Sequence, residues 1–463
     1  MKRRLLLAAG LLAACHTLPP EVLPPPWGPV HAQDTHLFFP SGLAVTADGA
    51  LLVANGNFNH AYDGGTVVGL SPDFIAGFFA RKLHCDVPAG AAAGACDQPI
   101  PPQAPAVIIG NYAGPLVLDA AGTTAYTGSR DTGVLNAVSV GVGGAVSCAP
   151  GSGSGTDCRG GLVDLKTAAS LDGPFTIVRG DFIPQGQTAA HPVLFVNSLV
   201  PHIESISSGV INTSSAVAAL EMGNPAQVLF TMPVATPFVA NGWAVGPMVF
   251  DGVRRRLYLG GCYERFPGTG AGEPGSGKCA GVTNNYLRII DVDAQGNAQP
   301  TLYDLYDDVL SIEITQLALA DPDPTTGAPT TLWATMRNPD ALVQIELPVQ
   351  PAISPRVRRV VPMPISPADM LIIPRPGASA LIVVAAEKSG AVAIYDTGLR
   401  AVVAVVEHLG LYPFSLAQVP CPASAGSACV AATVFGECKL AFIEVPLAAP
   451  WTAELRGRAG GCP

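Results

Sequence analysis

The sequence has few charged residues, which fill only 13% of its 463 positions. Acidic side chains outnumber basic ones, and the formal net charge is −10. Proteins that bind nucleic acids need clustered Lys and Arg side chains to contact phosphate groups, so a nucleic-acid partner is not predicted. A charge content this low also disfavours long helices that are exposed to solvent.

The sequence also lacks the short motifs that mark common catalytic sites. It contains no G-x-S-x-G, no H-E-x-x-H and no C-x-x-C, which are typical of serine hydrolases, zinc proteases and Cys-based zinc sites. Residues 272–279 (GEPGSGKC) come close to a phosphate-binding loop, but Cys279 stands where that loop needs the Ser or Thr that binds magnesium. No catalytic residue and no resident cofactor are therefore predicted.

What the sequence has in abundance indicates an all-β fold. Hydrophobic residues fill 49% of the chain, and there are 51 Gly and 44 Pro residues. This composition is typical of many short strands joined by tight turns. All-β proteins of this length are often a single domain, so internal repeats must decide how the chain is organised.

The N-terminal segment, MKRRLLLAAGLLAAC, has the features of an export signal. Three basic residues are followed by an apolar run over residues 5–14, which is too short to span a bilayer. The ending Leu12-Ala13-Ala14-Cys15 resembles the lipobox of bacterial lipoproteins, in which the chain is cut before a cysteine that receives a diacylglycerol. The resemblance implies that Cys15 is the lipidated N-terminus, anchored by several acyl chains. An ordinary signal peptide with an incidental Cys15 is the alternative.

The residues after Cys15 extend this interpretation. His16 follows the cysteine, and in many Gram-negative bacteria a residue other than Asp at this position fits sorting to the outer membrane. The next stretch, TLPPEVLPPPWGPVHAQ, is rich in proline and is predicted to be an extended tether. We therefore divide the chain into a signal peptide over residues 1–14, a lipidated cysteine and tether over 15–34, and one folded domain over 35–463.

The remaining cysteines also indicate export. Ten are left without Cys15, an even number, as expected where thiols pair oxidatively. The segments between neighbouring cysteines are mostly rich in Gly, Ala, Ser and Pro, so each bridge is predicted to close one loop. A metal site is the alternative, but no His lies at zinc-finger spacing. The predicted pairs are Cys85 with Cys96, Cys148 with Cys158, Cys262 with Cys279, Cys421 with Cys429, and Cys438 with Cys462.

A repeated pattern is clearest in residues 40–73, PSGLAVTADGALLVANGNFNHAYDGGTVVGLSPD. This stretch has the order strand, turn, strand, polar loop and strand. Six looser copies follow, and in the third of the seven the last strand is assigned near residues 203–211. Segments between copies, such as 107–109 and 357–361, supply a fourth strand. Seven copies of one pattern predict a seven-bladed β-propeller, in which each blade buries the faces of its neighbours; because the spacing of the copies is uneven, six or eight blades are the alternatives.

The first copy also carries a family resemblance. Its segments PSGLAV, DG, LLVAN and GTVVGL resemble the blades of the YVTN, NHL and lactonase-like propeller superfamily. Residues 57–65 (NFNHAYDGG) resemble a segment in propeller lipoproteins of Gram-negative bacteria. The resemblance implies a propeller over most of residues 35–447. Because this superfamily includes hydrolases, scaffolds and sensors, it does not imply one function.

The candidate ligand site lies in the loops that follow the second strand of each copy. Such loops tend to cluster at one mouth of a propeller, and here several of them carry polar side chains. The loop over residues 55–64 is longer and more polar than a blade turn requires, so a site is expected there first. The candidate ligand residues are Asn55, Asn57, Asn59, His60, Asp63, Arg130, Asp131, Glu264, Arg337 and Glu387.

Two functions from different classes fit these features. The main prediction is a lipid-anchored propeller that binds a protein, peptide or glycan partner in the cell envelope through its mouth, without a metal. The alternative is a lactonase-like hydrolase with a calcium or zinc ion at the mouth. That alternative requires three or more oxygen or nitrogen ligands around one point.

Overall fold

The computed structural model describes residues 36–85, 96–101, 104–183, 188–198, 202–207, 210–214, 216–222, 227–233, 242–264, 283–292, 301–304, 313–337, 339–348, 354–421 and 426–462. The predicted signal peptide, Cys15 and the predicted tether lie outside these residues. So do Cys279 and the rest of the segment 272–279.

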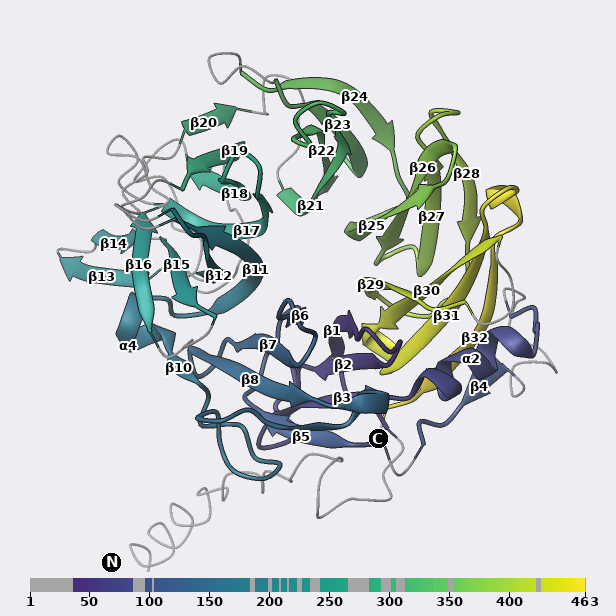
Figure 1. Cartoon of the computed structure of the whole chain (residues 1–463), viewed down its shortest axis with the longest axis horizontal. Coiled ribbons are helices and arrows are strands. Elements are labelled where there is room, and N and C mark those ends of the chain that lie inside the picture. Colours follow the sequence, from purple (N-terminus) through teal and green to yellow (C-terminus); the bar gives the residue numbers. More distant parts are fainter. Residues whose placement is uncertain are drawn as a thin grey trace, which may run out of the picture.

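Seven β-sheets form a ring around a central axis, as Figure 1 shows. The protein is therefore a seven-bladed β-propeller, and the predicted fold class and blade number are confirmed. The first strand of each blade lies nearest the axis, and the later strands follow outward. We number the blades 1 to 7 along the chain.

The strands of the first four blades begin and end as follows. Blade 1 contains β1 (Pro40–Val45), β2 (Leu51–Asn55), β3 (Gly65–Leu70) and β5 (Ala106–Ile109). Blade 2 contains β6 (Val117–Leu118), β7 (Thr124–Ser129), β8 (Val134–Val140), β9 (Val146–Cys148) and β10 (Val163–Asp164). Blade 3 contains β11 (Pro174–Phe182), β12 (His191–Ser198), β15 (Ala216–Glu221) and β16 (Val228–Pro233). Blade 4 contains β17 (Gly242–Asp251), β18 (Arg256–Glu264), β19 (Thr283–Asp291) and β20 (Thr301–Asp304).

The last three blades are more regular. Blade 5 contains β21 (Glu313–Pro322), β22 (Pro329–Arg337), β23 (Ala341–Glu346) and β24 (Arg356–Pro362). Blade 6 contains β25 (Pro367–Arg375), β26 (Ala378–Ala386), β27 (Ala391–Asp396) and β28 (Ala401–Val406). Blade 7 contains β29 (Pro413–Val419), β30 (Ser427–Val434), β31 (Lys439–Pro446) and β32 (Glu454–Gly460), and β4 (Asp97–Gln98) adds a fifth strand to it.

Short helices connect some of these strands. The longer two are α2 (Pro72–Ala80) and α4 (Leu165–Ala169). Three single-turn 3₁₀ helices are η1 (Val142–Gly144), η2 (Phe435–Glu437) and η3 (Pro450–Thr452). No helix in the described part of the chain is long and apolar enough to cross a membrane.

The predicted fourth strands of blades 1 and 5 are confirmed. Residues 107–109 lie in β5, which pairs with β3, and residues 357–361 lie in β24, which pairs with β23. In blade 2 the fourth position is divided, because β9 and β10 both pair with β8.

The strand predicted near residues 203–211 is wrong as part of blade 3. These residues belong to a separate hairpin of β13 (His202–Ser207) and β14 (Val210–Ser214), and the third strand of the blade is β15. The reason is burial. Residues 217–220 are fully buried in β15, a position that needs apolar side chains on both faces of the strand, whereas residues 203–211 include one Glu and three Ser.

The hydrophobic core consists of separate clusters between the blades. In the described residues there are seven such clusters, one at each boundary between neighbouring blades. The second strand of blade 1 reads as a continuous apolar run because its successive side chains enter the clusters on both sides of the blade. In β2, Leu51 and Val53 pack in the cluster shared with blade 7, and Leu52 and Ala54 pack in the cluster shared with blade 2. Each fully buried Leu contributes about 1.5–3 kcal/mol of hydrophobic stabilisation.

Polar side chains also join neighbouring blades near the axis. Ser41 Oγ donates to the carbonyl of Ala113 at 2.7 Å, and Asn197 Nδ2 donates to the carbonyl of Gly246 at 2.8 Å. Both contacts link an inner part of one blade to the next. They satisfy backbone acceptors at the boundaries between blades.

The ring is closed where blade 7 meets blade 1. Between β3 and β5 of blade 1 the chain passes through α2, which packs against blade 7: Phe78 stacks on Phe442 with a centroid distance of 4.2 Å and an interplanar angle of 18°. The chain then adds β4 in parallel beside β32, and Arg458 Nε bonds to Asp97 Oδ1 at 2.7 Å. Part of the connection between the third and fourth strands of blade 1 therefore covers the outer edge of blade 7, an edge that would otherwise expose unpaired backbone groups.

Four of the five predicted disulfides are present in the described residues. They are Cys85–Cys96, Cys148–Cys158, Cys421–Cys429 and Cys438–Cys462. The fifth predicted pair includes Cys279, which lies outside the described residues. Disulfides of this number indicate an exported protein, because reducing compartments keep thiols free.

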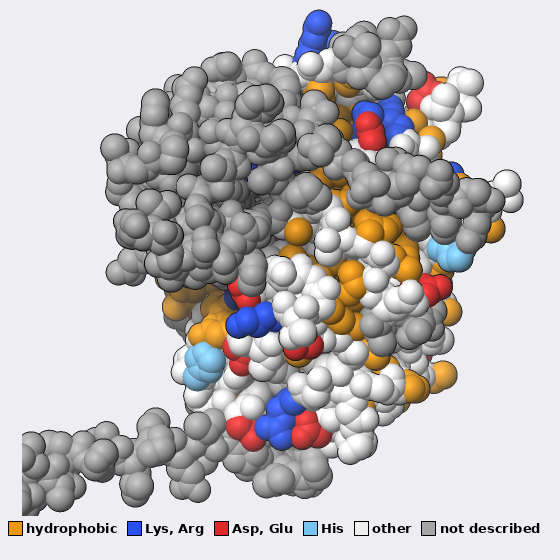
Figure 2. All heavy atoms as spheres, turned by 90° about the vertical axis from the view of Figure 1, so that its left-hand side faces the viewer, with side chains coloured by type: hydrophobic (Ala, Val, Ile, Leu, Met, Phe, Trp, Pro, Cys, Tyr) orange, Lys and Arg blue, Asp and Glu red, His pale blue; other side chains and the backbone are white. Residues whose placement is uncertain are grey.

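On the face in Figure 2, some of the described Lys, Arg, Asp and Glu side chains lie beside a charge of the opposite sign and others stand alone. Several charged side chains among the described residues form ion pairs at the surface. Arg256 and Asp291 form one such pair, with Nε and Oδ1 2.6 Å apart. Exposed pairs of this kind contribute little to stability, so the ring depends on the clusters between blades.

The close contact between β3 and η1 gives a test of the blade packing. A Cβ atom on Gly69 would lie 1.7 Å from the carbonyl oxygen of Gly144, so Gly69→Ala must force two backbones apart. We expect the variant to lose about 1–3 kcal/mol or more of unfolding free energy. The control is Gly77→Ala in α2, where a Cβ meets nothing within 4 Å and the helix gains up to about 1 kcal/mol. Urea denaturation with the disulfides intact measures both, and a stable Gly69→Ala variant would contradict the packing.

Candidate functional site

A cavity of about 720 Å³ lies at the axis of the propeller. The innermost strand of each blade, or the residues just before it, contributes to its wall. The ends of the second strands and the loops after them also reach it, with Phe58, Arg130, Arg337, Glu387 and Phe435. This volume lies within the range of small-molecule and peptide-end sites in proteins.

One side of the cavity is aromatic. We call Phe58, Phe175, Tyr412, Phe414 and Phe435 the aromatic wall; these residues come from blades 1, 3 and 7 and all line the cavity. Phe58 meets Phe435 edge to face, with centroids 4.9 Å apart, and Phe414 lies 6.1 Å from Phe435. Tyr412 remains 46% exposed. Aromatic groups that line a hollow and stay partly exposed offer apolar contact area to a ligand.

Arg130 lies between rings at the edge of the aromatic wall. Its guanidinium carbon is 5.1 Å from the centroid of Phe58, 5.4 Å from that of Tyr112 and 5.1 Å from that of Phe175. Its Nε donates to the carbonyl of Tyr112 at 3.3 Å. Burial disfavours the charged form and lowers the pKa of Arg130 to about 10. The side chain is still a cation at neutral pH.

The opposite side of the cavity, from blades 5 and 6, carries charges of both signs. Arg337 Nη2 bonds to Glu387 Oε2 at 2.7 Å, and Arg337 Nη1 lies 3.5 Å from Glu313 Oε1. Burial raises the pKa of Glu387, and the neighbouring Arg337 opposes that rise. We call Glu313, Arg337, Asp369 and Glu387 the charged wall. It holds three carboxyl groups and one guanidinium.

Asp369 joins three blades at the cavity wall. Its Oδ1 accepts from Gln316 Nε2 at 2.8 Å and from its neighbour's N–H, and its Oδ2 accepts from Leu416 N at 2.7 Å. These partners belong to β21 in blade 5 and β29 in blade 7. Burial raises the pKa of Asp369, and the hydrogen bonds it accepts act in the opposite direction. The carboxyl group therefore holds the inner strands together where the wall must also face a ligand.

The structure brings three of the ten sequence-derived candidates to the cavity and places six others elsewhere. Arg130, Arg337 and Glu387 line the cavity. Glu264 ends β18, and its side chain lies outside the described part of the structure. The remaining candidates, Asn55, Asn57, Asn59, His60, Asp63 and Asp131, are not among the lining residues.

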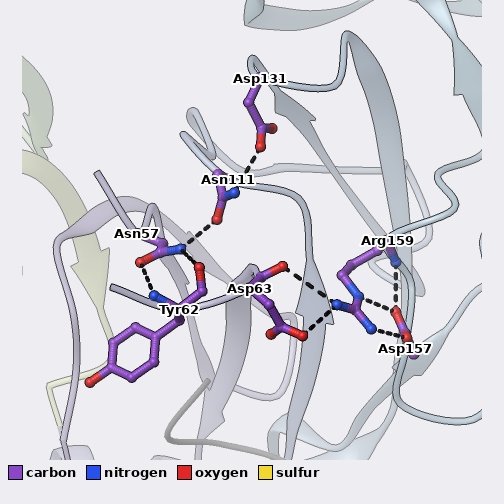
Figure 3. Close-up of polar contacts among 7 residues, drawn as sticks. All are labelled: Asn57, Tyr62, Asp63, Asn111, Asp131, Asp157 and Arg159. Carbon is purple, nitrogen blue, oxygen red and sulfur yellow. Dashed lines mark hydrogen bonds and ion pairs between the residues drawn. The ribbon is translucent and has the colours of Figure 1, made fainter. Parts of the chain in front are cut away.

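Asn57 organises the loop over residues 55–64, as Figure 3 shows. It is fully buried with a φ of 47°, its Oδ1 accepts from Tyr62 N at 3.2 Å, and its Nδ2 donates to the carbonyl of Tyr62 at 2.8 Å. The same Nδ2 donates to Asn111 Oδ1 at 2.5 Å, and Asn111 Nδ2 donates to Asp131 Oδ2 at 2.8 Å. This chain of bonds fixes the loop of blade 1 to blade 2.

Asp63 belongs to a second set of contacts between the same blades (Figure 3). Arg159 Nη1 lies 2.8 Å from Asp63 Oδ2, and Arg159 Nη2 lies 2.7 Å from Asp157 Oδ2. The hydrogen bond from Arg159 lowers the pKa of Asp157. Both carboxylates are therefore used to hold the blade 2 loop in place.

The other polar residues of the loop over residues 55–64 also bond within the protein. Asn55 Nδ2 donates to Thr66 Oγ1 at 2.9 Å, and Asn59 Oδ1 accepts from the N–H of Ala61 at 3.1 Å. His60 Nε2 is 2.6 Å from the hydroxyl of Tyr112, the residue whose ring lies beside Arg130. The polar side chains thus shape the loop, and its one phenylalanine, Phe58, lines the cavity.

The aromatic wall was missed in the sequence. Phe58 stands in a long polar loop, and Tyr412 and Phe414 flank the start of β29, so each is an aromatic residue in or beside a loop of the same mouth. Aromatic residues at such positions could have been used to predict the aromatic wall from the sequence. Asp369 gave a weaker signal, as an acidic residue inside an otherwise apolar strand.

In the residues that the structure describes, no three His, Cys, Asp or Glu side chains gather at a point where they could hold a metal ion. The metal-dependent hydrolase stays a prediction, and the side chain of its candidate residue Glu264 lies outside the described part of the structure.

Comparisons with known proteins give a likeness in fold. No family model and no curated protein matches the chain. Among solved structures it is similar to hydrazine synthase of Kuenenia stuttgartiensis, with a TM-score of 0.52 and 12% identity over 90% of this chain and 97% of that one. It is also similar to a putative 6-phosphogluconolactonase from Bacteroides uniformis, with a TM-score of 0.50 and 11% identity over 88% of this chain and 95% of that one. The predicted likeness to lactonase-like propellers is therefore confirmed for the fold alone.

Asp369 gives a pH-dependent test of the site. Because its folded pKa is raised, its stabilising contribution is present below the unfolded pKa and is lost as pH rises through the folded pKa. We expect Asp369→Asn to match the wild type near pH 4 and to gain unfolding free energy relative to it as pH rises to 8.

Asp323 provides the control of opposite sign. Hydrogen bonds led by the Thr326 backbone lower its pKa, so its contribution is present above the unfolded pKa and is lost as pH falls. Asp323→Asn should therefore cost stability at pH 8 and cost less near pH 4. Denaturant titrations at several pH values measure both differences. A difference for Asp369→Asn that follows the trend of Asp323→Asn would show that the Asp369 pKa is not raised.

Proposed function

We propose that this protein is a lipid-anchored binding module of the cell envelope, and that its central cavity takes part of an envelope partner. The observation that carries the proposal is the pairing of an aromatic wall with a charged wall in one cavity of about 720 Å³. A ligand site typically combines apolar lining with a few polar groups that fix orientation.

The size of the cavity narrows the kind of partner. A volume of this order takes a peptide end, a side chain or a short glycan, and not the surface of a globular protein. Leu411 and Tyr412 are 60% and 46% exposed beside the cavity, so a partner could also contact the rim. Exposed apolar residues that gather at one place often mark an interaction site.

The four disulfides support the envelope location, and the lipobox-like segment that ends at Cys15 supports the anchor. We propose that the lipid holds the propeller at the outer membrane. The alternative function, a metal-dependent lactonase-like hydrolase, has no additional support from the described residues.

Site-specific photocrosslinking tests the binding function. The photoreactive residue p-benzoylphenylalanine replaces Tyr412 at the cavity or, as the matched control, Trp451, which is 60% exposed and not part of the cavity lining. In living cells we expect a crosslinked peptide, protein or glycan product from position 412, identified by mass spectrometry, and at least about ten-fold less from position 451. Equal yields from both positions would argue against a cavity site.

The anchor has its own test. In a Gram-negative host, the wild-type protein should incorporate labelled palmitate and partition into the detergent phase of a Triton X-114 extraction. Cys15→Ser should abolish both, because no other residue can carry the predicted thioether. Cys85→Ser is the control, since it removes a cysteine of the Cys85–Cys96 disulfide and leaves the lipidation site intact. Membrane association of Cys15→Ser equal to that of the wild type would rule out lipidation at Cys15.

A further inference from the structure

We infer that Arg130 binds the carboxylate of an amphiphilic ligand whose apolar part lies against the aromatic wall. This inference rests on the proposed function, because it names the chemistry of the ligand that the same cavity takes. A peptide C-terminus with an apolar last residue has this chemistry, and so does a free arylalkyl acid.

The first observation is that Arg130 has rings around it and no carboxylate. Phe58, Tyr112 and Phe175 surround its guanidinium at 5.1–5.4 Å. None of the ion pairs found among the described residues includes Arg130. Its one hydrogen bond to a described residue uses Nε, so both terminal nitrogens keep their donors for another partner.

The second observation concerns what the surroundings of Arg130 do to its charge. Removing a cation from water is costly unless it is paired, and contacts with ring faces offset only part of that cost. The lowered pKa of Arg130 agrees with incomplete compensation. An anion that binds in the cavity would supply the missing partner through two parallel hydrogen bonds, the geometry that guanidinium and carboxylate groups favour.

The charged wall decides which anion fits best. Blade 2, which carries Arg130, lies across the ring from blades 5 and 6, which carry the charged wall (Figure 1). That wall has three carboxyl groups, from Glu313, Asp369 and Glu387, against the single guanidinium of Arg337. A dianion such as a phosphate monoester would face repulsion from this wall in a region of low dielectric. A single negative charge beside Arg130 meets less repulsion.

The aromatic wall decides what the carboxylate is attached to. Phe58 and Phe175 contact Arg130 and also line the cavity. The atoms next to a bound carboxylate would therefore meet ring faces, with Phe435 packed edge to face on Phe58 behind them. An apolar group at this place loses water-exposed area against aromatic carbon and gains affinity.

The test compares three probes that share a phenyl group: 4-phenylbutyrate, its neutral amide, and phenyl phosphate. The full-length protein in lipid nanodiscs is titrated calorimetrically, with empty nanodiscs as the reference. We expect the wild type to bind the carboxylate roughly ten-fold or more tightly than the amide, as a charge-assisted bidentate contact predicts. Phenyl phosphate should bind more weakly than the carboxylate.

Two variants assign this preference to one residue. Arg130→Met removes the charge but keeps a long side chain between the rings, and should reduce the preference for the carboxylate over the amide to less than about three-fold. Arg81→Met is the matched control. Arg81 also lies over a ring, with its guanidinium carbon 4.9 Å from the centroid of Phe78, but it follows the last residue of α2 and does not line the cavity. The Arg81→Met variant should keep the wild-type preference for the carboxylate over the amide. Thermal melting checks that both variants are folded.

The outcomes separate this inference from the proposed function. Equal affinity of the wild type for acid and amide, or an unchanged preference in Arg130→Met, overturns the role of Arg130. If Tyr412→Ala weakens both probes in that case, the cavity is still a ligand site and only the carboxylate inference fails. If neither probe binds, the carboxylate inference is overturned, and crosslinking at position 412 decides the binding function independently. Tighter binding of phenyl phosphate than of the carboxylate overturns the choice of a monoanion.

Discussion

The structure depends on one constraint: every blade has two apolar faces, and each face can be covered only by a neighbouring blade. An isolated blade would expose both, at about 25 cal/mol per Å² of apolar surface. Seven clusters between the blades meet this demand in the described residues, and the last of them forms only when blade 7 reaches blade 1. Closure of the ring is therefore required for the stability of every blade.

Closure explains features that look peripheral. Helix α2, strand β4 and the Cys85–Cys96 bridge all lie between the third and fourth strands of blade 1 in the sequence, yet in space they lie against blade 7. Cys438–Cys462 ties the last residues of the chain to the start of β31. These elements cover the outside of the boundary between blade 7 and blade 1. The first and last blades meet there, and no backbone connection joins them directly.

The cavity follows from the same architecture. Inner strands from seven blades surround the axis without meeting on it, so their side chains line a hollow that the packing itself creates. Its walls must satisfy two demands. Asp369 bonds across blades 5, 6 and 7 while facing the cavity, and Arg130 packs among rings while keeping donors for a partner. The proposed ligand site and the inner side of the ring are built from the same residues.

The fold could be predicted from the sequence because its signals are local. Each blade repeats short apolar strands and turns, and cysteines close to each other in the chain form the bridges. The site was harder to predict, because a polar side chain in a loop serves equally well to bind a ligand or to hold the loop in place by contacts within the protein. Asn57 and Asp63 do the second, and only their distant partners, Asn111 and Arg159, reveal it. Phe58 lies in the same loop and lines the cavity. A single aromatic residue in a polar segment does not reveal from the sequence which way its ring points.

The alternation along the second strands has a further consequence. Leu51 and Leu52 are adjacent in the chain, but Leu51 packs with Phe442 in blade 7 and Leu52 packs with Ala125 in blade 2. Their side chains belong to different clusters, so the energetic coupling between them is weaker than the coupling of each to a residue far away in the sequence. A change in the packing of Leu51 therefore acts first on the boundary with blade 7, and a change in the packing of Leu52 acts first on the boundary with blade 2. Residues that pack together in one cluster come from neighbouring blades and lie far apart in the sequence.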